Sequence, residues 1–142
     1  MAHHLDAINA AAAVIQSRTR LVPRVGIILG SGLGALADEL TQATVIRYHD
    51  IPGFPQSTVA GHRGELAIGL MSGTPVVVMR GRFHFYEGYD MHQVTFPVRV
   101  MQALGCAILI ATNAAGGLRP EWPVGQLVSL KDHIDRKSTR LN

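Results

Sequence analysis

The chain has 142 residues, of which 47% are hydrophobic and 16% charged, a length that fits about one domain of ~100–200 residues. This composition excludes a disordered chain and favours a buried α/β or α+β domain, and the longest apolar runs fall short of the ~20 residues that cross a bilayer. The net charge of +3 comes mostly from residues 135–142, and 6% of the residues are aromatic, so we expect no nucleic-acid partner and no membrane partner.

The first third of the chain predicts a helix, a strand and a glycine-rich turn. Residues 6–17 predict an amphipathic helix, preceded by frayed residues at His3 and His4. The apolar run 25–29 predicts a strand, which the turn 30–34 and a helical segment follow. The apolar positions of the first helix, at helical spacing, are Ile8, Ala11, Ala12 and Ile15.

The middle of the chain predicts a long loop and then a hairpin. Residues 51–63 contain two Pro, two Gly, a Ser and a Thr, which is typical of a loop that carries function. Residues 64–81 read as two strands about the turn Ser-Gly-Thr at 72–74, and the second strand is a continuous apolar run that predicts burial on both faces.

A second helix and a further strand follow. Asp90 is a plausible N-cap with Gln93 three residues later, and Gly105 ends the helix. We expect the Pro within this helix, at position 97, to kink it. The predicted apolar stripe of this helix consists of Val94, Val98, Met101 and Leu104.

Residues 106–117 repeat the pattern of an apolar strand followed by a glycine-rich loop. The single cysteine, Cys106, excludes an internal disulfide, reads as a core thiol and fits a cytoplasmic protein. Residues 124–134 predict another strand. Alternating strands and helices predict an α/β sheet with ligands at the carboxyl ends of its strands.

Three loops follow three apolar strands, and together they suggest an anion site. They are residues 30–34, 81–89 and 112–117. Glycines let the backbone approach a ligand closely, and successive N–H groups attract anions. If residues 81–89 are extended, Arg82, His84 and Tyr86 share a polar face and Phe83 and Phe85 an apolar one. Ser31, Arg82 and His84 could then donate to a phosphate.

Taken singly, each of these signals also has a structural explanation. The sequence GSGLG at 30–34 matches neither G-x-G-x-x-G nor the Walker A pattern. Arg82 alone fits a surface ion pair, and His84 a structural histidine. His62 alone fits a solvated loop, and Asn113 a turn. The histidines lack the spacing of metal ligands, so we expect no metal site.

Five motifs together resemble a known family. GSGLG, FPQSTVAGHRG, GRFHFYEGY, TFPVRV and TNAAGGL are similar, in order and interval, to those of the trimeric-type purine nucleoside phosphorylases, over residues 24–134. The resemblance implies a central mixed β-sheet flanked by helices, the purine nucleoside phosphorylase fold, present only in part. It implies phosphate-dependent cleavage of purine ribonucleosides and 2'-deoxyribonucleosides to free base and pentose 1-phosphate.

The resemblance also implies roles for individual residues. Matched motif to motif, the phosphate ligands would be Ser31, His62, Arg82, His84 and the main-chain N–H of Ala114. His84 would also be catalytic, and Tyr86 would contact the sugar. Inorganic phosphate would be a co-substrate, with no metal or organic cofactor. The full-length protein would be a homotrimer in the cytoplasm.

Members of this family are roughly twice as long as this chain. We therefore expect residues 1–134 to form the N-terminal portion of a single phosphorylase domain, and residues 135–142, DRKSTRLN, to be a foreign or read-through tail. A sheet cut midway exposes a strand edge and apolar surface. The polypeptide is then expected to be poorly soluble and to have little or no activity alone.

Three other functions stay open at this point. S-methyl-5'-thioadenosine phosphorylase belongs to the same superfamily, and the residues that choose the base are absent here. A dinucleotide-binding oxidoreductase domain would use GSGLG and needs an acidic residue ending the next strand. Asp50 has about the right spacing but lies in RYHDIPGFP, which is hardly a strand end. An interaction module without activity is the third.

Overall fold

The fold is described from a computed structural model, over residues 2–30, 32–56 and 63–132. Two α-helices, five strands and three short 3₁₀ helices succeed one another in these ranges. In chain order they are α1 (Ala2–Arg18), β1 (Val25–Ile28), η1 (Gly34–Glu39), β2 (Thr41–Arg47), η2 (Tyr48–Asp50), β3 (Glu65–Met71), β4 (Thr74–Arg80), η3 (Phe85–Glu87), α2 (Met91–Ala103) and β5 (Ile108–Ala111).

The five strands form one mixed sheet in the order β2-β3-β4-β1-β5. Strands β2, β3 and β4 are antiparallel neighbours, whereas β1 pairs in parallel with both β4 and β5. The hairpin between β3 and β4 turns at Ser72 and Gly73, which both have positive φ, as a tight hairpin turn requires. This mixed sheet confirms the predicted fold class.

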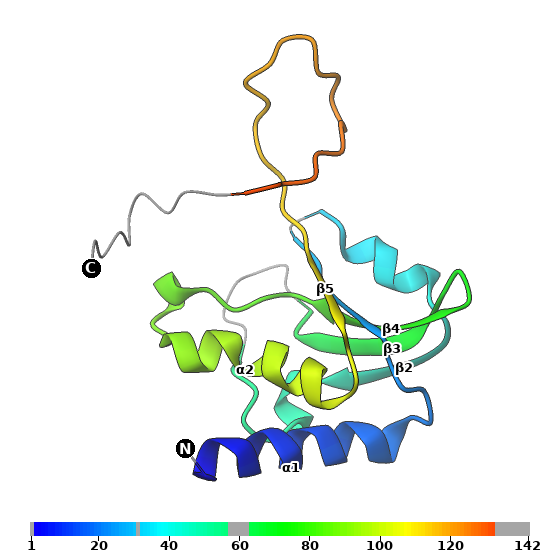
Figure 1. Cartoon of the computed structure of the whole chain (residues 1–142), viewed down its shortest axis with the longest axis vertical. Helices are drawn as coiled ribbons and strands as arrows, with labels where there is room; N and C mark the ends of the chain where they lie inside the picture. The colour runs from blue at the N-terminus through cyan, green and yellow to red at the C-terminus, as the bar shows by residue number, and fades with distance from the viewer. Residues whose placement is uncertain (1, 31, 57–62, 133–142) are drawn as a thin grey trace.

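The two faces of the sheet are covered by different elements (Figure 1). Helices α1 and α2 pack together on one face, where their apolar residues meet those of β3 and β4. Ala37 of η1 and the adjacent Leu40 pack on the other face, against β1 and β4. The predicted apolar positions of α1 are all buried, although the helix begins four residues earlier than predicted and includes His3 and His4.

Helix α2 begins and ends where the sequence predicts. The Asp90 carboxylate accepts from the Gln93 N–H at 2.8 Å, and the Gln93 side chain accepts from the Asp90 N–H at 2.9 Å. Gly105 has a φ of +109°, the left-handed conformation that ends many helices. The helix continues through Pro97, and the predicted kink stays a prediction. Its buried face differs from the predicted stripe, since it consists of Phe96, Pro97, Val100, Met101 and Leu104.

Three features of the sheet differ from the prediction. The segment after the glycine-rich turn forms a short 3₁₀ helix, and the edge strand β2 follows it; β2 was not predicted. Only Ile46 of β2 is buried, so the strand lacks the alternating pattern that reveals half-buried strands. The prediction of a strand at 124–134 is wrong for residues 124–132, which form no strand.

The last strand, β5, lies at an open edge of the sheet. All four of its residues are exposed, with 57% of the Ile108 surface accessible. Beyond it the chain makes a long loop, orange in Figure 1, that stands away from the sheet and exposes Leu118, Val124 and Leu127. This is the exposed apolar edge that the sequence predicts for an incomplete sheet. Within the described residues, no helix is both long and apolar enough for a membrane span.

Candidate active site

The carboxyl ends of β1, β4 and β5 meet at one edge of the sheet because these three strands are parallel neighbours. The Thr112 hydroxyl donates to the Ile28 carbonyl at 3.0 Å and accepts from the Gly30 N–H at 2.9 Å. A Cβ at Gly30 would lie 2.6 Å from the Thr112 carbonyl oxygen, so this approach requires glycine. The three predicted loops are therefore brought together, as expected.

Arg82 and His84 are joined directly in this cluster. The Arg82 Nε–H donates to His84 Nε2 at 2.9 Å, and Arg82 Nη1 donates to the Thr112 carbonyl at 3.3 Å. The other ring nitrogen, His84 Nδ1, lies 2.6 Å from Glu87 Oε1. Because Nε2 accepts the hydrogen bond from the Arg82 Nε–H, Nδ1 carries the ring hydrogen and donates it to the Glu87 carboxylate. His84 was predicted to donate to phosphate, and in this arrangement its Nε2 is an acceptor.

Tyr86 joins the same group by stacking. Its ring lies 4.5 Å from the His84 ring, centroid to centroid, at an interplanar angle of 18°. The shared face of Arg82, His84 and Tyr86 is thus present, but for a different reason than an extended chain. The backbone turns into η3 at Phe85, so Phe85 is 67% exposed while Phe83 is buried. The predicted apolar face of Phe83 and Phe85 is therefore wrong.

Tyr48 supports the first residue of the loop 81–89. Its hydroxyl donates to the Gly81 carbonyl at 2.7 Å, and its ring packs against Phe54 and Phe83 at centroid distances of 5.4 and 5.1 Å. Burial, with a smaller contribution from the Glu65 charge, raises the pKa of the Tyr48 hydroxyl far above its ordinary value. The phenol therefore stays protonated and keeps donating to Gly81, next to Arg82.

The remaining predicted site residues are placed less completely. Ala114 lies in the exposed loop after β5, two residues beyond Thr112, and its role stays a prediction. Asn113 donates from its side chain to the Ala114 carbonyl at 3.4 Å, which agrees with its alternative as a turn residue. Ser31 and His62 lie outside the described residues.

Sequence reasoning missed three residues of this cluster: Glu87, Thr112 and Tyr48. Glu87 follows His84 by three positions, and the spacing of a capping box was the available signal. Both members of that box are present, since the Glu87 carboxylate also accepts from the His84 N–H at 2.9 Å. The roles of Thr112 and Tyr48 depend on partners 84 and 33 residues away in the chain, so no local pattern could reveal them.

Chemically, this edge offers a guanidinium, an imidazole and a phenol around converging main-chain turns. Such a set suits an oxyanion beside a hydroxylated ligand. No group of three or more potential metal-ligating side chains occurs among the described residues.

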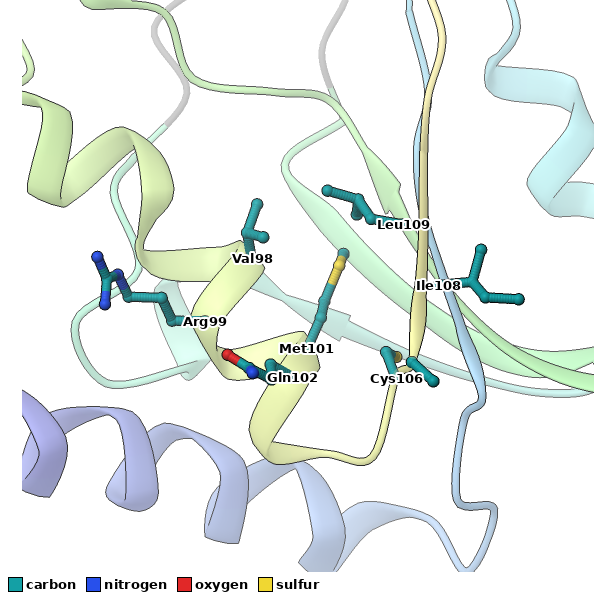
Figure 2. Close-up of a pocket in the computed structure, with 8 residues that line it drawn as sticks. Val98, Arg99, Met101, Gln102, Cys106, Ile108 and Leu109 are labelled. Carbon is teal, nitrogen blue, oxygen red and sulfur yellow. The ribbon is translucent and has the colours of Figure 1, made fainter.

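A separate pocket of about 230 Å³ lies between α2 and the beginning of β5, at the end of that strand opposite to the site. Met101, Cys106 and Leu109 line it (Figure 2).

Comparisons with known proteins agree with this geometry. Residues 24–141 match the model of the Phosphorylase superfamily. The chain is 54% identical over 134 residues to purine nucleoside phosphorylase 1 of Bacillus subtilis, covering 94% of this chain and 49% of that one. It is 51% identical over 121 residues to rat (Rattus norvegicus) purine nucleoside phosphorylase, covering 85% and 42%. The chain thus spans about half the length of these relatives.

Solved structures give the same result. A purine nucleoside phosphorylase in complex with ribose 1-phosphate superposes with a TM-score of 0.77 at 50% identity, over 85% of this chain and 44% of that chain. A Schistosoma phosphorylase in complex with hypoxanthine has a TM-score of 0.74 at 49% identity, over 83% and 41%. The family resemblance that the sequence motifs indicate is therefore confirmed.

Proposed function

The chain belongs to the phosphorylase superfamily, and we propose that it supplies the phosphate-binding part of a purine nucleoside phosphorylase. The reaction is the attack of inorganic phosphate on a purine ribonucleoside or deoxyribonucleoside, which releases the base and forms the pentose 1-phosphate. The names of the relatives and their complexes with ribose 1-phosphate and hypoxanthine support this choice of substrate class.

One observation carries the proposal. Arg82, His84 and the Thr112 carbonyl are in direct contact at the convergence of three strand ends. A guanidinium can form two parallel hydrogen bonds with phosphate oxygens, and this requires a fixed orientation. The contacts with His84 and Thr112 give Arg82 such an orientation. The converging turns also keep this cation within reach of main-chain N–H groups, as an anion site requires. Ser31, His62 and the N–H of Ala114 complete the proposed set of ligands.

Phosphate here needs positioning more than activation. Holding it beneath the anomeric carbon makes the attack effectively unimolecular, and its negative charge stabilises the cationic sugar as the purine leaves. His84 Nε2 already accepts from the Arg82 Nε–H at 2.9 Å, so we propose that His84 acts in catalysis by orienting the Arg82 guanidinium toward the phosphate. Tyr86 stacks on His84 and is 76% exposed, which supports a contact between its side chain and the sugar.

The proposal includes several features that follow from the family alone. Phosphate serves as a co-substrate and no metal or organic cofactor takes part. The full-length protein is a homotrimer in the cytoplasm. Residues 1–134 are one portion of a single domain.

The fold disfavours the dinucleotide-binding alternative. The strand after the glycine-rich turn, β2, is an antiparallel edge strand rather than a parallel neighbour of β1. Asp50 lies in η2, where its carboxylate pairs with His49 at 3.3 Å. It therefore does not end the second strand of a βαβ unit, the position that a ribose-binding carboxylate occupies.

The decisive experiment uses a chimera, in which the matched residues of this chain replace those of the Bacillus subtilis relative. With inosine and inorganic phosphate, the chimera should release hypoxanthine, and the release should stop when phosphate is omitted. Methylthioadenosine serves as the competing substrate. Turnover of methylthioadenosine alone, or no phosphate dependence, would contradict the proposal. The 142-residue chain by itself should show little or no release.

A further inference from the structure

Arg80, the last residue of β4, places a charge inside the protein. Only 7% of its surface is exposed. Its Nη2 donates to Asp38 Oδ1 at 2.6 Å, and its Nη1 lies 3.6 Å from Glu65 Oε2. A buried guanidinium is costly unless carboxylates compensate it. The close contact with Asp38 is therefore the principal compensation for this charge.

The Asp38–Arg80 pair joins two segments that are 42 residues apart in sequence. Asp38 lies in η1, which begins at Gly34, the last residue of the glycine-rich turn. Arg80 lies two residues before Arg82. A third segment also reaches the pair, because Arg63 Nη1 lies 3.7 Å from the same Asp38 oxygen. One carboxylate thus stands where three predicted phosphate-binding segments meet.

Among the described residues, few other contacts hold η1 in place. It is a six-residue 3₁₀ helix without a side-chain cap at its first turn, and such helices are weak on their own. Its single buried residue is Ala37, which packs with Leu40 against β4. A small apolar contact fixes the helix on the sheet, whereas the directional 2.6 Å ion pair fixes its position along β4.

We propose that Asp38 is a positioning residue, which through Arg80 holds the glycine-rich turn beside Arg82 so that both face one phosphate. This inference rests on the proposed function. Asp38 does not touch the phosphate itself. Loss of its charge should loosen one wall of the anion site while leaving the sugar and base contacts unchanged.

The first test measures kinetics in the chimera. Asp38→Asn should raise the phosphate KM about tenfold, equivalent to ~1.4 kcal/mol, while kcat and the inosine KM stay within about twofold. Asp50→Asn is the matched control, since Asp50 is 47% exposed against 53% for Asp38 and, among the described residues, pairs only with its sequence neighbour His49. That control should leave all three constants unchanged.

A rescue variant separates positioning from general damage. In Asp38→Asn the buried Arg80 keeps, within the described part of the chain, only the more distant Glu65 carboxylate. Adding Arg80→Gln removes this poorly compensated charge and lets two amides pair. The double variant should therefore bind phosphate more tightly than Asp38→Asn alone. The single variant Arg80→Gln completes the cycle. If the losses in phosphate affinity of Asp38→Asn and Arg80→Gln simply add in the double variant, the two side chains are not coupled and the proposal is overturned.

The second test is independent of activity. Hydrogen exchange of the 142-residue chain should be faster at residues 33–40 in Asp38→Asn than in Asp50→Asn, with the β3–β4 hairpin unchanged. Unchanged exchange, or faster exchange with an unchanged phosphate KM, would overturn the positioning role. Absence of phosphorolysis in the parent chimera would instead overturn the proposed function, and the exchange data would still decide whether Asp38 holds η1.

Discussion

At the scale of single residues, the site depends on Arg82 being held in one orientation. Its Nε and Nη1 are committed to His84 and to the Thr112 carbonyl, so the planar guanidinium is fixed before any anion arrives. Pre-organised cations bind phosphate with less loss of side-chain entropy. The residue-scale predictions concern this arginine and the tyrosine beneath its loop.

Replacing Arg82 should raise the KM for phosphate more than the KM for the nucleoside. In the chimera, Arg82→Ala should raise the phosphate KM at least about tenfold, because a charge-assisted hydrogen bond contributes ~1.5–3 kcal/mol. The exposed Arg47 of β2 provides the control, and Arg47→Ala should change no kinetic constant. An equal effect of both variants would mean that the net charge, rather than this contact, attracts phosphate.

Tyr48→Phe removes the hydrogen bond to the buried Gly81 carbonyl without changing the volume of the ring. An unpaired buried carbonyl costs ~1–3 kcal/mol, so denaturant unfolding of the 142-residue chain should show a loss of that order. Tyr48→Leu, which also loses ring packing against Phe54 and Phe83, should lose more.

The same residue predicts a pH dependence. The pKa of Tyr48 is raised above the ordinary 10.0, so above that pH the unfolded chain releases a proton that the folded chain keeps. The contribution of Tyr48 to the free energy of unfolding is therefore fully present below pH 10, and it decreases as the pH rises above 10. Burial also raises the pKa of Cys106, to about 11. Because both proteins share Cys106, Tyr48→Phe should lose less stability than the parent between pH 10 and 11.

At the scale of elements, local signals were reliable where the chain supplies its own partners. The β3–β4 hairpin and the ends of α2 use turn and cap residues adjacent in sequence. Strand β2 was not recognised, and the buried face of α2 was recognised only at Met101 and Leu104, because tertiary packing selects the rest. Phe96 is buried by contact with Phe54, at a centroid distance of 6.0 Å, and the sequence pattern of α2 alone favoured Val94 and Val98.

The cap of α2 gives the element-scale prediction. Asp90→Ala removes the acceptor for the Gln93 N–H and should lower the free energy of unfolding by about 1 kcal/mol. Asp90→Ser, which restores a capping oxygen, should recover most of that loss. Circular dichroism during denaturant unfolding measures both. Equal stability of Asp90→Ala and the parent would show that the capping box contributes nothing.

At the scale of the whole molecule, the open edge at β5 dominates the behaviour expected in solution. No described strand pairs with its outer side, and Ile108, Leu109 and Ile110 are each at least 46% exposed. Exposed apolar edge strands pair with other chains. This surface therefore promotes self-association when the chain is produced alone.

A matched pair of variants tests this edge. Ile108→Lys should shift the 142-residue chain toward smaller species in light scattering, because a lysine on an edge strand opposes pairing. Leu5→Lys on α1 adds the same charge at a similar exposure, 60% against 57%, and should have little effect. Equal improvement by both variants would point to net charge, and a monodisperse parent would contradict the prediction.

The sequence by itself determined the family, the mixed α/β class, the hairpin, the caps of α2 and the grouping of Arg82, His84 and Tyr86. These features depend on residue types at fixed short spacings. Only the tertiary structure decided that Tyr48 and Thr112 support the loops and that Asp38 neutralises the buried Arg80. The physical reason is that hydrogen bonds and ion pairs between distant segments depend on strand order and register, which arise only when the sheet assembles.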